Sequence, residues 1–179
     1  PGRHPIPSAR AFAAVLARLG ISATTKVVAY DDAGGAIASR VWWLFRHFGL
    51  ASATLLDGGL PAWIEAGGEL VTEAPALIPA PLLALVARTD DLVDKRAVDR
   101  LRAQPDVLVL DARATERFEG KSEPIDARPG HIPGARSAPF AHNLVAPGGR
   151  FHDAAALTTR FESAGALQAK TVVCYCGSG

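Results

Sequence analysis

The chain has 179 residues, of which 49% are hydrophobic and 21% are charged. This composition is apolar enough for a buried core and too polar for a chain embedded in a membrane, so it predicts one or two folded α/β units. The formal net charge is only +1 and the 19 basic residues are scattered, which excludes the basic surface typical of nucleic-acid-binding proteins.

The first ten residues, PGRHPIPSAR, lack the basic-then-apolar pattern of a signal peptide. No apolar run approaches the roughly 20 residues that span a bilayer, so we expect a cytoplasmic protein without membrane contact. Cys174 and Cys176 are too close for an ordinary structural disulfide and too few for a four-ligand zinc site. We therefore expect a reactive thiol in a reducing compartment, and no metal.

The first expected elements are a capped helix and a short strand. Ser8 is the expected N-cap of an apolar-periodic stretch that ends at Gly20, and the β-branched run around Val27 predicts a strand leading to Asp31. The Gly-rich DAGGA then precedes a second helix, IASRVWWLFRHFG, in which His47 is expected to be a packed residue. Its apolar residues fall at helical spacing: Ile37, Val41, Leu44, Phe45 and Phe48.

The next segment, ATLLDGGLPAWIEAGGEL, predicts a buried strand, a Gly-Gly turn and a short helix. Residues 73–81 are rich in Pro and Ala without clear periodicity, so 73–86 is the expected linker. A helical stretch from Ala87 to about Ala103 then leads into DVLVLDAR, an apolar run typical of a parallel strand covered on both faces. Helices alternating with strands predict an α/β fold with a mostly parallel sheet flanked by helices.

The chain also contains an internal repeat. Residues 8–32 and 153–177 align without a gap at an offset of 145 residues, which pairs Gly20 with Gly165 and Tyr30 with Tyr175. Asp153 takes the N-cap position of Ser8. The repeat places Asp31 opposite Cys176, so two copies of one architecture are expected to carry different chemistry.

Three separated motifs together resemble the rhodanese family, specifically its tandem-domain thiosulfate and 3-mercaptopyruvate sulfurtransferases. The motifs are DARATERFEG at 111–120, GHIPGA at 130–135 and CGSG at 176–179. The resemblance implies that residues 1–72 are the C-terminal part of a first, non-catalytic domain and that 73–86 are the linker. Residues 87–179 are then the N-terminal part of the catalytic domain, so the chain is expected to be truncated at both ends.

The resemblance makes Cys176 the catalytic nucleophile. Glycines after the cysteine let backbone N–H groups converge on an anion, which favours the thiolate, so Gly177, Ser178 and Gly179 are expected to bind the substrate. The implied reaction is a double displacement. The thiolate takes a sulfur from a small-molecule donor, and the persulfide passes it to a thiol or cyanide acceptor without any cofactor.

Arg117 occupies the position at which the family places a guanidinium facing the substrate carboxylate. The family's second arginine has only a differently spaced candidate here, Arg128. Since Ser178 is uncharged, CGSG resembles the 3-mercaptopyruvate type more than the thiosulfate type. Without the resemblance, a solvated surface arginine is the preferred interpretation of Arg117.

Other notable residues have structural interpretations. Cys174 alternates with Cys176 along a strand, which predicts a buried thiol. Structural pairing is expected for Asp111 and Arg113, and a hydrogen bond within its loop for His131. Asp31 and Asp32 could form a carboxylate dyad, but the repeat places them in a degenerate catalytic loop.

Two other functions stay open. A rhodanese-fold phosphatase or arsenate reductase would have a longer loop after the cysteine, ending in an arginine that wraps a larger oxyanion. A non-enzymatic rhodanese module could act in regulation or sulfur relay, which the presence of Cys176 disfavours.

Overall fold

The computed structural model describes residues 3–146 and 149–177. These residues form two compact units. Of the described residues, the N-terminal unit comprises 6–92, 146 and 149–150, and the C-terminal unit comprises 3–5, 93–145 and 151–177. None of the described helices is long and apolar enough to cross a membrane.

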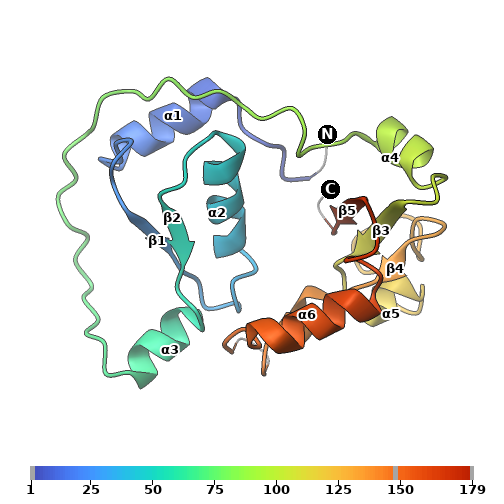
Figure 1. Cartoon of the computed structure of the whole chain (residues 1–179). Helices are drawn as coiled ribbons and strands as arrows, with labels where there is room; N and C mark the ends of the chain where they lie inside the picture. Colours follow the sequence, from blue (N-terminus) through green and yellow to red (C-terminus); the bar gives the residue numbers. More distant parts are fainter. Residues whose placement is uncertain (1–2, 147–148, 178–179) are drawn as a thin grey trace. The chain divides into compact units, whose positions relative to one another are not determined.

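The N-terminal unit contains a two-stranded parallel sheet and the helices α1, α2 and α3 (Figure 1). Its strands, β1 and β2, pair with Val27 opposite Ala53, and α2 packs beside them. The elements in chain order are α1 Ala9–Arg18, β1 Val27–Ala29, α2 Ala38–His47, β2 Ala53–Leu55 and α3 Gly59–Glu65.

The core of this unit is aromatic. The ring of Phe12 on α1 meets that of Phe45 on α2 edge-on at 5.7 Å and stacks on that of Phe48 at 5.1 Å. Leu16, one turn further along α1, is 2% exposed. Only part of the predicted apolar face of α2 is buried, because Ile37 at its N-cap is 66% exposed.

The chain between α3 and α4 is extended and contains neither helix nor strand (Figure 1). It follows the N-terminal unit: the Ala80 N–H donates to the Ala17 carbonyl, and the Arg88 N–H donates to the His47 carbonyl. His47 is a packed residue as predicted, 4% exposed, and its ring hydrogen-bonds the Asp91 carboxylate at 2.9 Å. These contacts hold the segment in extended form.

The predicted helix from Ala87 to about Ala103 is therefore wrong in its first half. Helix α4 spans Lys95–Leu101, and the side chain of Asp94 caps it by accepting from the Ala97 N–H at 2.8 Å. The division into 1–72, 73–86 and 87–179 stays a prediction.

The C-terminal unit contains a three-stranded parallel sheet in the order β4-β3-β5. β3 is the central strand and its residues are buried from Leu108 to Asp111, as the apolar run predicts. The elements are α4, β3 Val107–Asp111, α5 Thr115–Phe118, β4 Arg136–Ser137, the 3-10 helix η1 Phe140–Asn143, α6 Ala154–Ser163 and β5 Thr171–Tyr175.

Both faces of β3 are covered. Leu108 and Leu110 pack with Ala138 against residues of α6 and the turn after it, including Phe161. Val109 faces the other way and packs with Val173 of β5 against a cluster that includes Val98 of α4. The observed architecture is thus α/β, with parallel sheets flanked by helices.

The internal repeat is visible in the structure. Helices α1 and α6 have the same bounds at the 145-residue offset, and the Ser8 and Asp153 side chains cap them in the same way, each accepting a backbone N–H three residues on. Gly20 and Gly165 end the two helices with φ of 72° and 84°, a left-handed conformation that favours glycine.

The contrast between Leu16 in α1 and Leu19 at the C-cap of this helix tests the importance of the aromatic core. Leu16→Ala should lower the free energy of unfolding by about 2–5 kcal/mol, because it leaves a cavity in a packed core. Leu19→Ala is the matched control, since Leu19 is 47% exposed, and it should cost less than about 1 kcal/mol. Denaturant unfolding followed by circular dichroism measures both. Equal losses would contradict the placement of the core.

Candidate active site

The candidate site lies at the carboxyl ends of β3 and β5. Asp111 and Tyr175 are register partners at the last positions of these strands, and Cys176 follows directly. Both cysteines are exposed, and Gly177 is the last described residue. Ser178 and Gly179, predicted to bind substrate, lie outside the described residues.

A fully buried carboxylate joins the two strand ends. Asp111 is 0% exposed, and its Oδ2 accepts hydrogen bonds from the Tyr175 hydroxyl and from Arg113 Nη2, both at 2.6 Å. Arg113 Nε donates to the same carboxylate at 3.0 Å. The backbone N–H of Ile132 donates to the Tyr175 oxygen at 3.1 Å, which ties the GHIPGA loop to the same group. The predicted Asp111–Arg113 pairing is thus present.

These contacts set the charges at the site. Burial opposes the ionisation of Asp111, but hydrogen bonds from Arg113 and Tyr175 outweigh it, so the pKa of Asp111 lies below its ordinary value. Burial and the hydrogen bond to Asp111 raise the pKa of Tyr175 to about 12. The side-chain hydrogen bond to Asp111 likewise raises the pKa of Arg113. The phenol beside Cys176 therefore stays neutral and its carboxylate partner stays charged.

Arg113 connects this centre to a second ion pair through Glu123. The side chain of Glu123 is 4% exposed and accepts from Arg113 Nη1 at 3.2 Å and from Arg117 Nη2 at 2.7 Å. The backbone N–H of Asp126 and the Arg117 side chain lower the pKa of Glu123 to about 2. Glu123 was not predicted from the sequence.

Arg117 lies against the cysteine loop. A Cβ atom on Gly177 would approach Arg117 Nη1 to 2.7 Å, so the guanidinium occupies the space next to the residue after Cys176. The side chain of Arg117 is 15% exposed and is also paired with Asp126 at 3.0 Å. It is therefore not the solvated surface arginine that the residue alone would suggest. Arg128 is exposed, with no hydrogen bond or ion pair to the described residues.

Cys174 is exposed, so the predicted burial of its thiol is wrong. Cys174 is the register partner of Leu110 and lies on the same face of the sheet, where α6 and the turn after it pack on Leu108 and Leu110 of the central strand. The protein atoms around its inner side still desolvate the thiol and raise the pKa of Cys174, which disfavours the thiolate.

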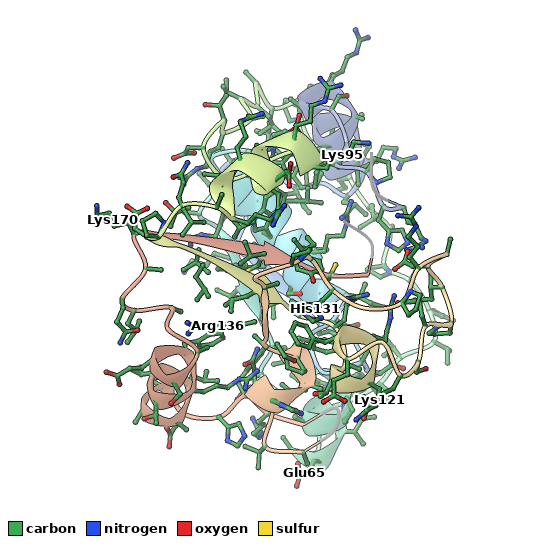
Figure 2. All side chains as sticks on the ribbon, turned by 90° about the vertical axis from the view of Figure 1, so that its right-hand side faces the viewer. Glu65, Lys95, Lys121, His131, Arg136 and Lys170 are labelled. Carbon is green, nitrogen blue, oxygen red and sulfur yellow. The ribbon has the colours of Figure 1, made fainter. Side chains whose placement is uncertain are left out.

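His131 makes a hydrogen bond as predicted, but its partner is the last residue of α5 and does not belong to its own loop. Its Nδ1 lies 2.7 Å from the Phe118 carbonyl oxygen, which can only accept, so the ring nitrogen donates. The imidazole also stacks on the Phe118 ring, with centroids 3.7 Å apart, next to α5 (Figure 2). These contacts give His131 a structural role in holding the GHIPGA loop against α5.

The N-terminal unit has a loop at the repeat position of the cysteine loop, and this loop binds the carboxylate of Asp31. Asp31 Oδ1 accepts from the N–H groups of Ala33 and Gly35, and Oδ2 accepts from those of Ile37 and Ala38, at 2.8–2.9 Å. Partial burial opposes ionisation, but these four bonds together lower the pKa of Asp31. The loop that leads into α2 is therefore an anion-binding loop, filled by its own aspartate.

No group of three or more His, Cys, Asp or Glu side chains in residues 3–146 and 149–177 is arranged to hold a metal ion.

The pKa of Glu123 predicts a pH dependence. A carboxylate whose folded pKa is lowered from 4.5 to about 2 stabilises the fold at pH values above about 4.5 and loses that contribution as the pH falls toward 2. Glu123→Gln should therefore destabilise the protein most above pH 5, with a difference from the unsubstituted protein that shrinks toward pH 2. Urea unfolding across this range measures it. The exposed Glu119 gives a control, Glu119→Gln, and a pH-independent difference for Glu123→Gln would contradict the assignment.

The sequence model of the Rhodanese-like domain matches residues 1–66 and 94–179. Among curated proteins, the "Probable 3-mercaptopyruvate sulfurtransferase" of Pseudomonas aeruginosa is 41% identical over 182 residues, covering 99% of this chain and 63% of that protein. The human 3-mercaptopyruvate sulfurtransferase is 37% identical over 187 residues, covering all of this chain and 61% of that protein.

Among solved structures, SseA from Escherichia coli superposes with a TM-score of 0.84 at 28% identity, covering all of this chain and 66% of SseA. It is described as a 3-mercaptopyruvate sulfotransferase with the "Rhodanese" fold. The chain thus spans a little under two thirds of the length of these relatives. On the matched residues and the shared fold, this chain belongs to the rhodanese-like family.

Proposed function

We propose that the protein is a sulfurtransferase that moves a sulfur atom from a small-molecule donor to a thiol or cyanide acceptor through a persulfide on Cys176. The observation that carries the proposal is the placement of the Arg117 guanidinium against Gly177, directly after the cysteine. A cation at this point can hold an anionic donor with its sulfur close to the thiolate. The relatives named as 3-mercaptopyruvate sulfurtransferases support the same reaction.

The internal repeat supports an anion-stabilising role for the loop that begins at Cys176. Asp31 is the repeat partner of Cys176, and its carboxylate accepts four backbone N–H groups of the following loop. A loop of the same form after Cys176 would present N–H groups to a thiolate or persulfide anion, with Gly177, Ser178 and Gly179 as its first residues. Such N–H groups would bind the anionic sulfur of the nucleophile. Desolvation raises the pKa of the neighbouring thiol of Cys174, which disfavours its thiolate.

The proposed reaction has two steps. With 3-mercaptopyruvate, the Cys176 thiolate attacks the donor sulfur, an S–S bond forms and the donor C–S bond breaks. The electron pair of the broken bond leaves on the three-carbon product, which takes up the thiol proton and becomes pyruvate. In the second step the acceptor attacks the outer sulfur, and Cys176 leaves as a thiolate. Neither step requires a metal or an organic cofactor.

We favour 3-mercaptopyruvate over thiosulfate as the donor. It carries one carboxylate, which the guanidinium of Arg117 can bind through two parallel hydrogen bonds. The CGSG sequence adds no cationic side chain for a dianion such as thiosulfate.

We also infer that the chain contains parts of two tandem rhodanese-like domains, 1–72 and 87–179, joined by 73–86. The matching bounds of α1 and α6 and the two matched segments of the domain model support this division. The Asp31 carboxylate occupies the loop of the first copy, which supports a non-catalytic role for that copy.

Substitution of each cysteine tests the nucleophile. In the intact protein, Cys176→Ser should abolish sulfur transfer, whereas Cys174→Ser should keep most of it. Mass spectrometry after donor treatment should show a gain of about one sulfur that dithiothreitol removes, as expected of a persulfide. Added sulfur that persists in Cys176→Ser would place the nucleophile elsewhere.

The donor is tested by comparing kcat/KM for 3-mercaptopyruvate and thiosulfate, with the first expected to be higher. Arg117→Ala should lower kcat/KM for 3-mercaptopyruvate by on the order of 1.5–3 kcal/mol, the scale of a hydrogen bond to a charged group. An equal loss for both donors would indicate a structural arginine. Hydrolysis of a phosphate ester without any sulfur transfer would favour the phosphatase alternative.

A further inference from the structure

The N-terminal segment brings a second guanidinium to the residue after Cys176. Arg3 Nη1 donates to the Gly177 carbonyl, and its Nη2 donates to the Ile125 carbonyl at 3.3 Å and pairs with the Asp126 carboxylate. Arg3 and Gly177 are 174 positions apart in the sequence, so only the fold brings them together. Two guanidiniums, those of Arg3 and Arg117, therefore converge on Gly177.

One carboxylate bridges the two arginines. Asp126 Oδ1 pairs with Arg3, and Asp126 Oδ2 accepts from Arg117 Nη2 at 3.0 Å. The Asp126 side chain is 37% exposed, whereas that of Glu123, the other partner of Arg117, is 4% exposed. Glu123 is thus a fixed partner inside the protein, and Asp126 is a partner at the surface that solvent can reach.

The arginines retain donors for a ligand. Arg117 uses Nε and Nη2 for its two carboxylates, while its Nη1, which faces Gly177, makes no hydrogen bond with the described residues. The side chain of Arg3 is 43% exposed. A carboxylate arriving from solvent could replace that of Asp126 between the two guanidiniums without leaving a buried charge unpaired.

We propose that Arg3 and Arg117 together form the site for the carboxylate of the sulfur donor, and that Asp126 occupies this site until the donor binds. The inference rests on the proposed sulfurtransferase function. It assigns the role of second carboxylate-binding arginine to Arg3. Arg128 has no hydrogen bond or ion pair with the residues that the structure describes.

Steady-state kinetics of the intact protein with 3-mercaptopyruvate test the proposal. Arg3→Ala should raise KM about tenfold and change kcat less than about threefold, because the lost contact holds a group that does not react. Arg3→Lys should recover part of KM, since it keeps the charge without the planar fork. Asp126→Asn should lower KM about two- to fivefold, because it removes the competing charge. Arg100→Ala, an exposed arginine of α4, is the matched control.

An unchanged KM in Arg3→Ala with a raised KM in Arg128→Ala would overturn the proposal and return the second position to Arg128. A raised KM in Asp126→Asn would overturn the exchange, because Asp126 would then be needed to hold the arginines in place. If the unsubstituted protein transfers no sulfur, the proposed function fails, and pyruvate binding measured by calorimetry still tests the carboxylate site. Binding that is weakened by Arg3→Ala supports the site, and equal binding rules it out.

Discussion

The candidate site depends on the buried carboxylate of Asp111. A charge without solvent exposure is stable only with partners, and here Arg113 and Tyr175 supply them at 2.6 Å. Because Asp111 ends β3 and Tyr175 ends β5, the same hydrogen bonds fix the two strand ends relative to each other. Cys176 is attached to the next backbone position, so its location follows from a contact in which the cysteine takes no part.

From this carboxylate, charges of alternating sign lead to the loop after the cysteine. In order they belong to Asp111, Arg113, Glu123, Arg117, Asp126 and Arg3. Each inner member contacts a neighbour of opposite sign on both sides, so partly buried ions are compensated along the whole series. The series also changes in exposure, from 0% at Asp111 to 43% at the side chain of Arg3. Its buried end is suited to structural stability and its exposed end to exchange with a ligand.

Local patterns allowed prediction of much of the fold. Ser8 and Asp153 were predictable as N-caps because capping depends only on residues within one turn of the helix. The repeat that relates the two helices can be recognised from the amino-acid sequence alone. Tertiary contacts overrode the pattern before α4, where the segment is held to His47 and does not form the predicted helix. At the site, the motifs predict functional roles for Cys176 and Arg117, and these roles stay predictions. Glu123, Asp126 and Arg3 have no such signal, because their importance lies in contacts made across the fold.

Each unit includes a short piece of chain from the other half of the sequence. Among the described residues, 3–5 belong to the C-terminal unit, and 146 and 149–150 belong to the N-terminal unit, where Arg150 Nη1 donates to the Asp57 carbonyl at 3.3 Å. A single cut near Leu92 would therefore not yield two complete halves, since each fragment would lose a segment and carry one that belongs to the other. Arg3 and Gly177 are 174 positions apart, and contacts between residues so distant in the sequence form late in folding because a long loop must first be closed. The arginine beside the cysteine loop is thus placed late, which makes the site one of the last parts of the described chain to form.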